Sequence, residues 1–421
     1  MTTHRRDFLR TFTAGAAALA LPRLVFSATA RPHVVVVGGG FGGATAARYL
    51  RMWSERSVEV TLIERESSFV SCPLSNLVIA GLQRMDDITL GYDRLHSHWG
   101  VRRVTDEAIG LDFGRRTVST ARHGAIPYDR LVLAPGVEML SARIDGLSGQ
   151  EDRIPHAWKA GVHTATLRRQ LEAMPDGGVF AMSIPRAPYR CPPGPYERAC
   201  LVAHYLRTRK PRSKVLVFDA NAGIVAKQAL FQQAFARYGD MIDYRPNSTL
   251  LGVDAATREA EFEFERVRAD VLNPIPPMRA GNIAAAGGLA LVNDAWVDVD
   301  WLTLGASGLP GVHVIGDAVF PAPGMPKSGH MANQHAKVAA AAILNELAGV
   351  PPNPTPVVMN TCYSFVDERA AMHVASVHQW DAGRSQLLPV PDAGGLSAAA
   401  TAAEGRAALQ WAHAIWADTL G

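Results

Sequence analysis

The sequence is poor in cysteine, and its cysteines are too widely spaced for the common metal and haem motifs. No C-x-x-C pair occurs, which excludes zinc-ribbon and thioredoxin-type sites, and no C-x-x-C-H occurs, so this chain attaches no c-type haem itself. His330 and His335 are five residues apart, which is off the i, i+4 spacing that one helix face needs to hold a metal. We therefore expect no metal site. The four cysteines are Cys72, Cys191, Cys200 and Cys362.

The chain also lacks an excess of charge of either sign. The formal net charge is +3, but residues 1–30 hold four of the 42 Lys and Arg and one of the 39 Asp and Glu, which leaves 38 of each beyond them. That balance gives no reason to expect nucleic acid or an anionic membrane surface as a partner. With 421 residues, 48% of them hydrophobic, the chain is long enough for two or three lobes with sizeable cores.

Residues 1–30 have the pattern of an export signal. A charged segment, residues 4–10, precedes the apolar residues 11–21, and Ala28-Thr29-Ala30 matches a small-residue cleavage site. The apolar run is too short for a membrane span of about 20 residues. Arg5-Arg6-Asp7-Phe8-Leu9 resembles the twin-arginine signal, so we expect a periplasmic protein that is exported folded. An uncleaved N-terminal helix is the alternative.

A glycine-rich turn follows the leader. An apolar strand at 34–37 leads into Gly38, Gly40 and Gly43, which match G-x-G-x-x-G, and a helix-compatible stretch follows at 44–53. Glycines permit a tight turn and close backbone approach to a pyrophosphate at the positive end of the helix. Glu64 lies 21 residues past Gly43, at the end of the next strand, where a carboxylate can bind an adenosine ribose. The pattern predicts a dinucleotide site.

A second motif favours FAD over NAD as that dinucleotide. Gly316-Asp317 follows a strand at 312–315 and is typical of flavoproteins with two dinucleotide domains, in which the Asp binds flavin hydroxyls. The helix that starts near Ser328 would direct its positive N-terminus at the pyrimidine edge of the flavin. Lys327 either adds to this charge or is a solvated turn residue.

A second strand-turn-helix unit lacks the glycines. The strand 179–184, the helix 196–209 and the strand 214–218 repeat the first arrangement, but residues 185–195 between them are rich in proline. Prolines remove N–H donors, and side chains in this loop block close approach, so no pyrophosphate should bind there. Two such units predict an α/β, doubly wound architecture, and NAD(P)H is not the expected reductant.

Four segments resemble the flavoprotein subunit of flavocytochrome c sulfide dehydrogenase. The resemblance covers essentially the whole mature chain and includes the twin-arginine leader. It departs from expectation at His330-Met331, where smaller or more apolar residues would be typical. The segments are Ser71-Cys72-Pro73-Leu74-Ser75-Asn76, Tyr189-Arg190-Cys191-Pro192-Pro193-Gly194-Pro195-Tyr196-Glu197-Arg198-Ala199-Cys200, Met325-Pro326-Lys327-Ser328-Gly329-His330 and Asn360-Thr361-Cys362-Tyr363-Ser364.

The resemblance implies a glutathione-reductase-like flavoprotein with two dinucleotide-binding domains and a small C-terminal α+β domain. The expected parts, in chain order, are the signal peptide 1–30, the first half of the FAD domain 31–155, the second Rossmann-like domain 156–275, the second half of the FAD domain 276–350 and the C-terminal domain 351–421.

The same resemblance assigns roles to the cysteines. It implies a redox-active disulfide between Cys191 and Cys362, which hydrosulfide can open by thiol-disulfide exchange, and a thioether from Cys72 to FAD. The alternatives are an inert structural disulfide for the pair and a buried free thiol for Cys72. Cys200 lies among apolar residues of the helix, and we interpret it as a core cysteine.

Glu197, six residues past Cys191, is the expected proton acceptor beside the disulfide; a charge that only complements the helix dipole is the alternative. Because the chain has no haem motif, the implied electron acceptor is a c-type cytochrome subunit. A sulfide:quinone oxidoreductase is the nearest alternative, and an FAD-bearing accessory protein of a sulfur-oxidation system is another. The terminal helix, expected at residues 398–420, has an apolar side, including Trp411 and Trp416, which we expect to contact the core or a subunit rather than a membrane.

Overall fold

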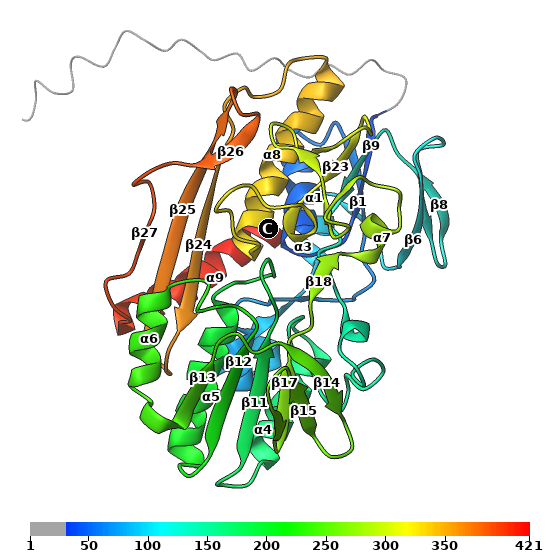
Figure 1. Cartoon of the computed structure of the whole chain (residues 1–421). Helices are drawn as coiled ribbons and strands as arrows, with labels where there is room; N and C mark the ends of the chain where they lie inside the picture. Colours follow the sequence, from blue (N-terminus) through cyan, green and yellow to red (C-terminus); the bar gives the residue numbers. More distant parts are fainter. Residues whose placement is uncertain (1–30) are drawn as a thin grey trace, which may run out of the picture.

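The computed structural model describes residues 31–421, and within them the chain forms two lobes joined along one side by a C-terminal sheet (Figure 1). The leader, and with it the predicted twin-arginine signal, lies outside the described residues. Among those described, no helix is both long and apolar enough to cross a membrane. Nor do they bring together a group of three or more His, Cys, Asp or Glu side chains able to hold a metal.

The upper lobe is built around a seven-stranded sheet in the order β21-β22-β23-β9-β1-β2-β5. Its inner strand β1 carries four consecutive valines that are fully or almost fully buried, because helices and loops cover both faces. The strands of this sheet are β1 (His33–Val37), β2 (Glu59–Ile63), β5 (Arg102–Val104), β9 (Arg130–Leu133), β21 (Val299–Asp300), β22 (Gly305–Ala306) and β23 (Val312–Val314).

Two long helices pack together on this sheet. Helix α1 (Phe41–Trp53) contacts α8 (Gly329–Ala348), and α8 is capped by the Ser328 hydroxyl, which accepts the Met331 N–H, and by Gly349 in the left-handed region. The smaller elements of this lobe are α3 (Asp93–Ser97), α7 (Asn282–Ala285), β3 (Phe69–Val70), β4 (Thr89–Leu90), β6 (Ala108–Asp112), β7 (Thr117–Thr120), β8 (Gly124–Pro127), β10 (Val137–Met139), β18 (Met278–Ala280), β19 (Leu291–Val292) and β20 (Trp296–Val297). Helix α2 (Ser75–Ile79) follows β3 in the chain and packs against helices of the lower lobe.

The lower lobe repeats the strand-helix-strand arrangement. A parallel sheet in the order β13-β12-β11-β17 is flanked by helices, and a three-stranded antiparallel sheet extends the lobe. Its elements are α4 (Val162–Ala173), β11 (Val179–Ile184), α5 (Gly194–Arg209), β12 (Lys214–Asp219), α6 (Gln228–Ala236), β13 (Ile242–Arg245), β14 (Leu250–Asp254), β15 (Glu259–Phe262), β16 (Arg266–Arg268) and β17 (Val271–Pro274). The doubly wound fold expected from two such units is confirmed.

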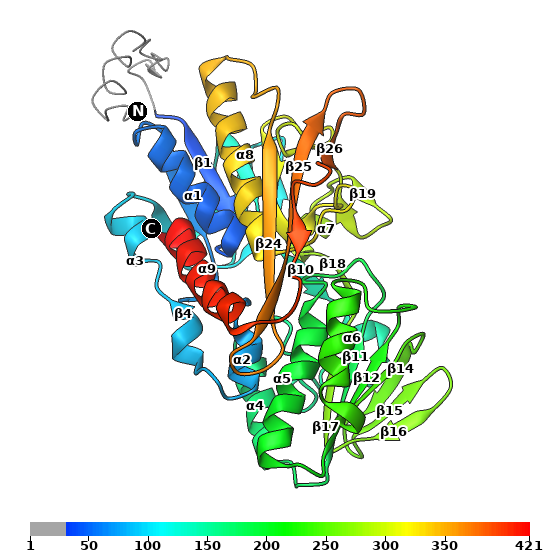
Figure 2. The same cartoon turned by 90° about the vertical axis from the view of Figure 1, so that its left-hand side faces the viewer.

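The C-terminal unit lies along both lobes. Figure 2 shows β24 beside α8 with its lower end near α5, and both contacts are present in the structure. The terminal helix packs on α1, β24 and β25, and Ala412, Ile415 and Trp416 on its apolar side are buried, so it docks on the core as expected. The unit comprises β24 (Val357–Phe365), β25 (Ala371–Asp381), β26 (Gln386–Pro389), β27 (Gly395–Leu396) and α9 (Ala402–Leu420).

Two helix starts differ from the expected positions for local reasons. Helix α5 begins at Gly194 rather than Tyr196, since Pro195 is tolerated in a first turn whose N–H groups have no partner within the helix. Helix α9 begins at Ala402 rather than 398, because the Thr401 hydroxyl caps it by accepting the Glu404 N–H at 3.2 Å.

Candidate active site

A cavity of about 760 Å³ opens where the carboxyl ends of β1 and β2 meet the loops of the lower lobe. Its volume falls in the range of roughly 300–1,000 Å³ that is typical of cofactor and ligand pockets. Residues that line it include Gly38, Gly40, Glu64, Pro135, Lys159 and Arg190. The predicted dinucleotide turn therefore faces this cavity.

The three motif glycines have different physical reasons to be glycine. A Cβ on Gly43 would lie 1.8 Å from the Gly38 carbonyl oxygen, and one on Gly38, which has a φ of +96°, would lie 2.3 Å from the Ala134 carbonyl oxygen. A Cβ on Gly40 would meet nothing within 4 Å. Gly38 and Gly43 thus close the turn, whereas Gly40 keeps the helix N-terminus open to the cavity, as a bound pyrophosphate requires.

Glu64 lines the cavity and also fixes the turn. One carboxylate oxygen accepts the Gly39 N–H at 2.5 Å, and the other accepts the Glu66 N–H at 2.8 Å. Each oxygen has a further lone pair, so a ribose hydroxyl could still donate to this carboxylate. The ribose contact itself stays a prediction.

Asp317 has a free hydrogen-bonding capacity that fits a ligand. Its Oδ1 is buried and has no hydrogen-bond partner among residues 31–421, while its Oδ2 lies 4.0 Å from Arg190 Nε. Burial raises the pKa of this carboxyl, and the charges of Arg190 and Lys327 oppose that effect. A buried, unpartnered oxygen calls for a donor, which the hydroxyls of an FAD ribityl chain would supply.

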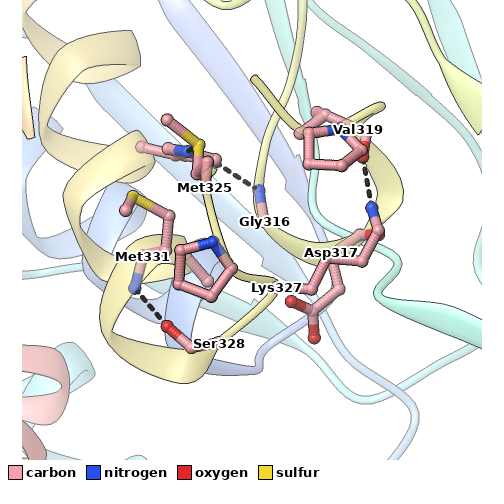
Figure 3. A pocket seen from close by; sticks show the side chains of 11 residues that line it. Gly316, Asp317, Val319, Met325, Lys327, Ser328 and Met331 are labelled. Atoms are coloured by element: carbon pink, nitrogen blue, oxygen red, sulfur yellow. Dashed lines mark hydrogen bonds between the residues drawn. The ribbon is translucent and has the colours of Figure 1, made fainter. Parts of the chain in front are cut away.

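Lys327 is buried, so the alternative that it is a solvated turn residue is wrong. Its side chain runs past Asp317, as Figure 3 shows, and Nζ donates to the carbonyl oxygens of Asp317 at 3.0 Å and of Val319. Nζ also lies 3.8 Å from the centroid of the Trp296 ring. Burial lowers the pKa of this lysine to about 7, with the charge of Asp317 opposing it. Its charge is therefore directed to backbone carbonyls beside the Gly316-Asp317 turn.

Cys72 and Cys362 both lie near Cys191. The Cys191 N–H donates to the Lys327 carbonyl at 2.8 Å, which joins the proline-rich loop to the start of α8, and Cys191 has a φ of +57°. The Cys72 sulfur lies 3.4 Å from Arg190 Nη2. Burial raises the pKa of Cys191, and the neighbouring charges of Cys362, Glu197 and Cys72 raise it further.

All four cysteines are free thiols in the structure. The disulfide between Cys191 and Cys362 and the thioether at Cys72 therefore stay predictions. Cys200 is 0% exposed within α5, which agrees with its interpretation as a core cysteine.

Glu197 bridges three elements. From the first turn of α5 it accepts the Phe365 N–H of β24 at 2.7 Å and the Asn76 side-chain amide of α2 at 2.8 Å. Burial raises the pKa of this carboxyl, while the Phe365 and Asn76 hydrogen bonds and the charges of Lys227 and Arg198 lower it. The side chain is thus directed at the cysteine-bearing strand, as a proton acceptor beside Cys362 would need to be.

The motif analysis missed several polar residues of the site. Asn76, Arg190, Arg198 and Asn360 all lie within the four segments that carried the family resemblance, so that signal contained them without assigning them roles. Arg198 is 1% exposed and donates to Asn76 at 3.0 Å. Lys227 lies in none of these segments, and nothing in its local sequence marks it.

Besides its proline-rich turn, the lower lobe has a second feature that disfavours a nucleotide, the carboxylate of Asp219. Asp219 ends β12, near the position that Glu64 has after β2, and is 0% exposed. Its Oδ2 accepts the hydroxyls of Tyr196 at 2.7 Å and Tyr244 at 2.8 Å, and its Oδ1 accepts from Asn221. The carboxylate that would bind a ribose is occupied by protein donors.

Comparison with known proteins places the chain. Residues 164–276 match the family described as the central part of the sulfide dehydrogenase (flavocytochrome c) flavoprotein chain, and residues 354–420 match the flavin-binding part of flavocytochrome c sulphide dehydrogenase. Residues 32–171 match pyridine nucleotide-disulphide oxidoreductases. A sulfide dehydrogenase (flavocytochrome c) flavoprotein chain from Chlorobaculum thiosulfatiphilum is 60% identical over 46 residues, which cover 11% of this chain and 94% of that sequence. The chain belongs to this flavoprotein family.

More distant relatives share the fold. A sulfide-quinone reductase from Aquifex aeolicus is 26% identical over 368 residues, which cover 82% of this chain and 83% of the relative. The structure of the Aquifex aeolicus sulfide:quinone oxidoreductase matches with a TM-score of 0.77 at 20% identity, over 92% of this chain and 91% of that one. Putidaredoxin reductase, in its complex with putidaredoxin, matches with a TM-score of 0.66 at 17% identity, over 92% and 93%.

Family membership and geometry agree on the cofactor. The flavin-binding family match identifies a flavoprotein, and the open turn at Gly40 together with the unpartnered Asp317 oxygen fits FAD. Gly38, Gly40, Gly43 and Glu64 would hold the adenosine diphosphate part, and Gly316, Asp317 and Lys327 the flavin part; these individual contacts stay predictions.

Proposed function

We propose that this chain oxidises sulfide at the Cys191/Cys362 pair, with FAD as electron acceptor and a c-type cytochrome subunit as partner. One observation carries the proposal: the proline-rich loop that replaces a nucleotide turn brings Cys191 to the start of α8, beside the flavin cavity. Membership of the sulfide dehydrogenase flavoprotein family supports the substrate.

Hydrosulfide attacks one sulfur of the oxidised pair, the Cys–Cys bond breaks, and one cysteine carries a persulfide while the other is released as a thiolate. Release of the sulfur and return of the pair to the disulfide require that two electrons leave. FAD supplies the acceptor for that electron pair and the means of passing electrons singly to a haem.

Glu197 is suited to take the proton in this reaction. Its carboxylate is held against β24 by the Phe365 N–H, and its raised pKa places it closer to neutrality than an exposed glutamate. It can receive the proton of the attacking sulfur and return it when the product leaves.

Arg190 supports a covalent role for Cys72. Its guanidinium lies 3.4 Å from the Cys72 sulfur and lines the cavity, so a thiolate at this position faces a fixed positive charge. We expect flavin to stay with the denatured protein and to be lost from it in Cys72→Ser. A Cys72→Ser protein that keeps flavin after denaturation would remove the thioether from the proposal.

The twin-arginine pattern supports periplasmic export, where a cytochrome partner would be met. Cleavage after Ala30 predicts a mature N-terminus at Arg31, which sequencing of the purified protein would test.

Sulfide-dependent reduction of cytochrome c tests the main proposal. Purified protein should lose its flavin absorbance on addition of sulfide and pass the electrons to cytochrome c. A flavin that sulfide does not bleach would overturn the function.

A sulfide:quinone oxidoreductase is the second candidate, favoured by the match to the Aquifex aeolicus enzyme over most of both chains. The buried apolar side of α9 argues against it, since Ile415 and Trp416 pack inside the protein and not toward a membrane. Faster turnover with a soluble quinone than with cytochrome c, and recovery of the protein with membranes, would favour this candidate.

A further inference from the structure

Lys227 is a buried lysine that makes contact with the backbone of Cys362. It is 5% exposed and directly precedes α6, with a φ of +56°. Its Nζ donates to the carbonyl oxygens of Cys362 at 2.8 Å and Met372 at 3.0 Å, and to the Ser364 hydroxyl at 3.0 Å. These acceptors are all neutral, and among residues 31–421 no carboxylate lies within 4.0 Å of this ammonium. A buried positive charge is thus fixed at the strand that carries Cys362.

Lys227 also connects the same two parts of the molecule as the cysteine pair. Cys191, Glu197 and Lys227 belong to the lower lobe, and Cys362 belongs to β24 of the C-terminal unit. Glu197 holds β24 through the Phe365 N–H, and Lys227 holds it through the Cys362 carbonyl. When the disulfide is open, these two contacts still keep the Cys362 strand against the loop of Cys191.

The surroundings of the two sulfurs differ. Cys362 receives a hydrogen bond from the Asn360 amide at 3.3 Å, and Asn360 in turn accepts the Ser328 hydroxyl at 2.6 Å. Burial raises the pKa of Cys362, but the hydrogen bonds of Asn360 and Ser328 and the charge of Lys227 lower it, with Glu197 opposing them.

Cys191 has less compensation for its burial. Burial, Cys362, Glu197 and Cys72 all raise its pKa, and Arg190 is the charge that lowers it. The Arg190 guanidinium is shared, since it also contacts the Cys72 sulfur and lies 4.0 Å from Asp317. Lys227 itself faces Cys362, Glu197, Cys191 and Glu404, and burial lowers its pKa to about 8, so it is mostly charged at neutral pH.

We propose that Lys227 is a positioning residue that makes Cys362 the thiolate of the opened pair and thereby directs hydrosulfide to Cys191. The direction of attack rests on the proposed function. In this step the hydrosulfide sulfur bonds to the Cys191 sulfur, the Cys191–Cys362 bond breaks, and its electron pair stays on Cys362 beside the Lys227 ammonium. The better-stabilised thiolate is the better leaving group in thiol-disulfide exchange.

Alkylation of the reduced holoprotein tests the charge effect without sulfide. The rate of iodoacetamide modification at the Cys362 peptide is followed by mass spectrometry on dithiothreitol-reduced protein, over a pH range that extends well above the ordinary thiol pKa of 9.0. The charge of Lys227 lowers the pKa of Cys362, so Lys227→Met should move the Cys362 midpoint upward, by about one unit. Lys227→Arg, which keeps the charge, should move it less.

Lys210→Met is the matched control. Lys210 is also a buried lysine of the lower lobe whose ammonium donates to backbone carbonyls, those of Glu172 at 2.6 Å and Met174, but it lies outside the site. It should leave the Cys362 midpoint in place. A midpoint that Lys227→Met also leaves in place would overturn the role of Lys227.

A second measurement uses the wild-type protein and so does not depend on whether a variant folds. After one equivalent of sulfide and rapid alkylation, the extra sulfur should be found on the Cys191 peptide. Its recovery on Cys362 would overturn the direction of attack while leaving sulfide oxidation intact. If sulfide neither bleaches the flavin nor modifies either cysteine, the proposed function and this direction fail together, and the alkylation series alone decides what Lys227 does to Cys362.

Discussion

The two strand-turn-helix units of this protein share the same order of strands and helices, but the turn between strand and helix differs in its residues and its role. In the upper lobe β1 leads through Gly38 and Gly40 into α1, and the N-terminus of the helix is open to the flavin cavity. In the lower lobe β11 leads through a proline-rich loop into α5, and the loop carries Cys191. The same topological position therefore holds a cofactor in one unit and a thiol in the other.

The carboxylate at the end of the second strand of each unit, Glu64 or Asp219, also differs between the two units in what it contacts. Glu64 uses backbone N–H donors and still faces the cavity, whereas Asp219 is enclosed by Tyr196, Tyr244 and Asn221. The two units differ in the length and side chains of the turn and in the partners of this carboxylate, but not in the order of these strands. Loss of the nucleotide site in the lower lobe is thus a local replacement, which leaves the sheet intact and places new chemistry at its edge.

Removing the thiol of the second turn should have the largest effect. Cys191→Ser should lower sulfide-dependent flavin reduction by at least about a thousandfold, because no residue remains to form the persulfide. Flavin content should not change. Cys200→Ser is the control and should keep its activity. Cys200 lies nine residues after Cys191, and it is buried within α5. Sulfide turnover by Cys191→Ser near the wild-type rate would show that the second turn is not the reaction site.

Glu197 should make the sulfide-oxidising activity depend on pH. Burial raises the pKa of this carboxyl above the ordinary value of 4.5, and a base acts only when ionised, so kcat should fall as the pH falls through that raised value. Glu197→Gln should lower kcat by about 100-fold and remove this acidic limb. The check is the pH profile of kcat with saturating sulfide. An unchanged limb in the variant would assign the titration to another group.

The first turn can be altered without altering its packing. Gly40→Thr adds a side chain where a Cβ meets nothing within 4 Å, and Thr is a favourable helix cap, so the fold should persist. Flavin binding should weaken at least about tenfold, since the side chain projects where the pyrophosphate would lie. Flavin per chain after purification measures this. Gly395→Thr, which also meets open space but far from the turn, is the control; equal flavin in both variants would contradict the placement.

The sequence predicted the frame well and the side-chain environment less well. The strands around Val36 and Met182 and the turn at Gly38 follow from apolar runs and glycine spacing, which are local signals. The burial of Lys327 and Lys227 could not be predicted, because their acceptors are backbone carbonyls of Val319 and Met372 that only the tertiary fold brings near. The convergence of the cysteines came from the family resemblance, and no local pattern contains it.

A substitution of Asp219, the enclosed carboxylate of the lower lobe, should have the smallest effect and the clearest contrast with a substitution of Glu64. Asp219→Asn replaces an acceptor oxygen by an N–H donor among the hydroxyls of Tyr196 and Tyr244 and the Asn221 amide. The unfolding free energy should fall by about 1–3 kcal/mol, the usual cost of leaving a buried polar group unpaired, seen as a lower urea midpoint. Flavin content should stay the same, because Asp219 does not line the cavity. Glu64→Gln is the matched variant and should lose flavin instead. If Asp219→Asn lowered flavin content as much as Glu64→Gln, Asp219 would affect the flavin site, and the functional contrast between the two carboxylates would be wrong.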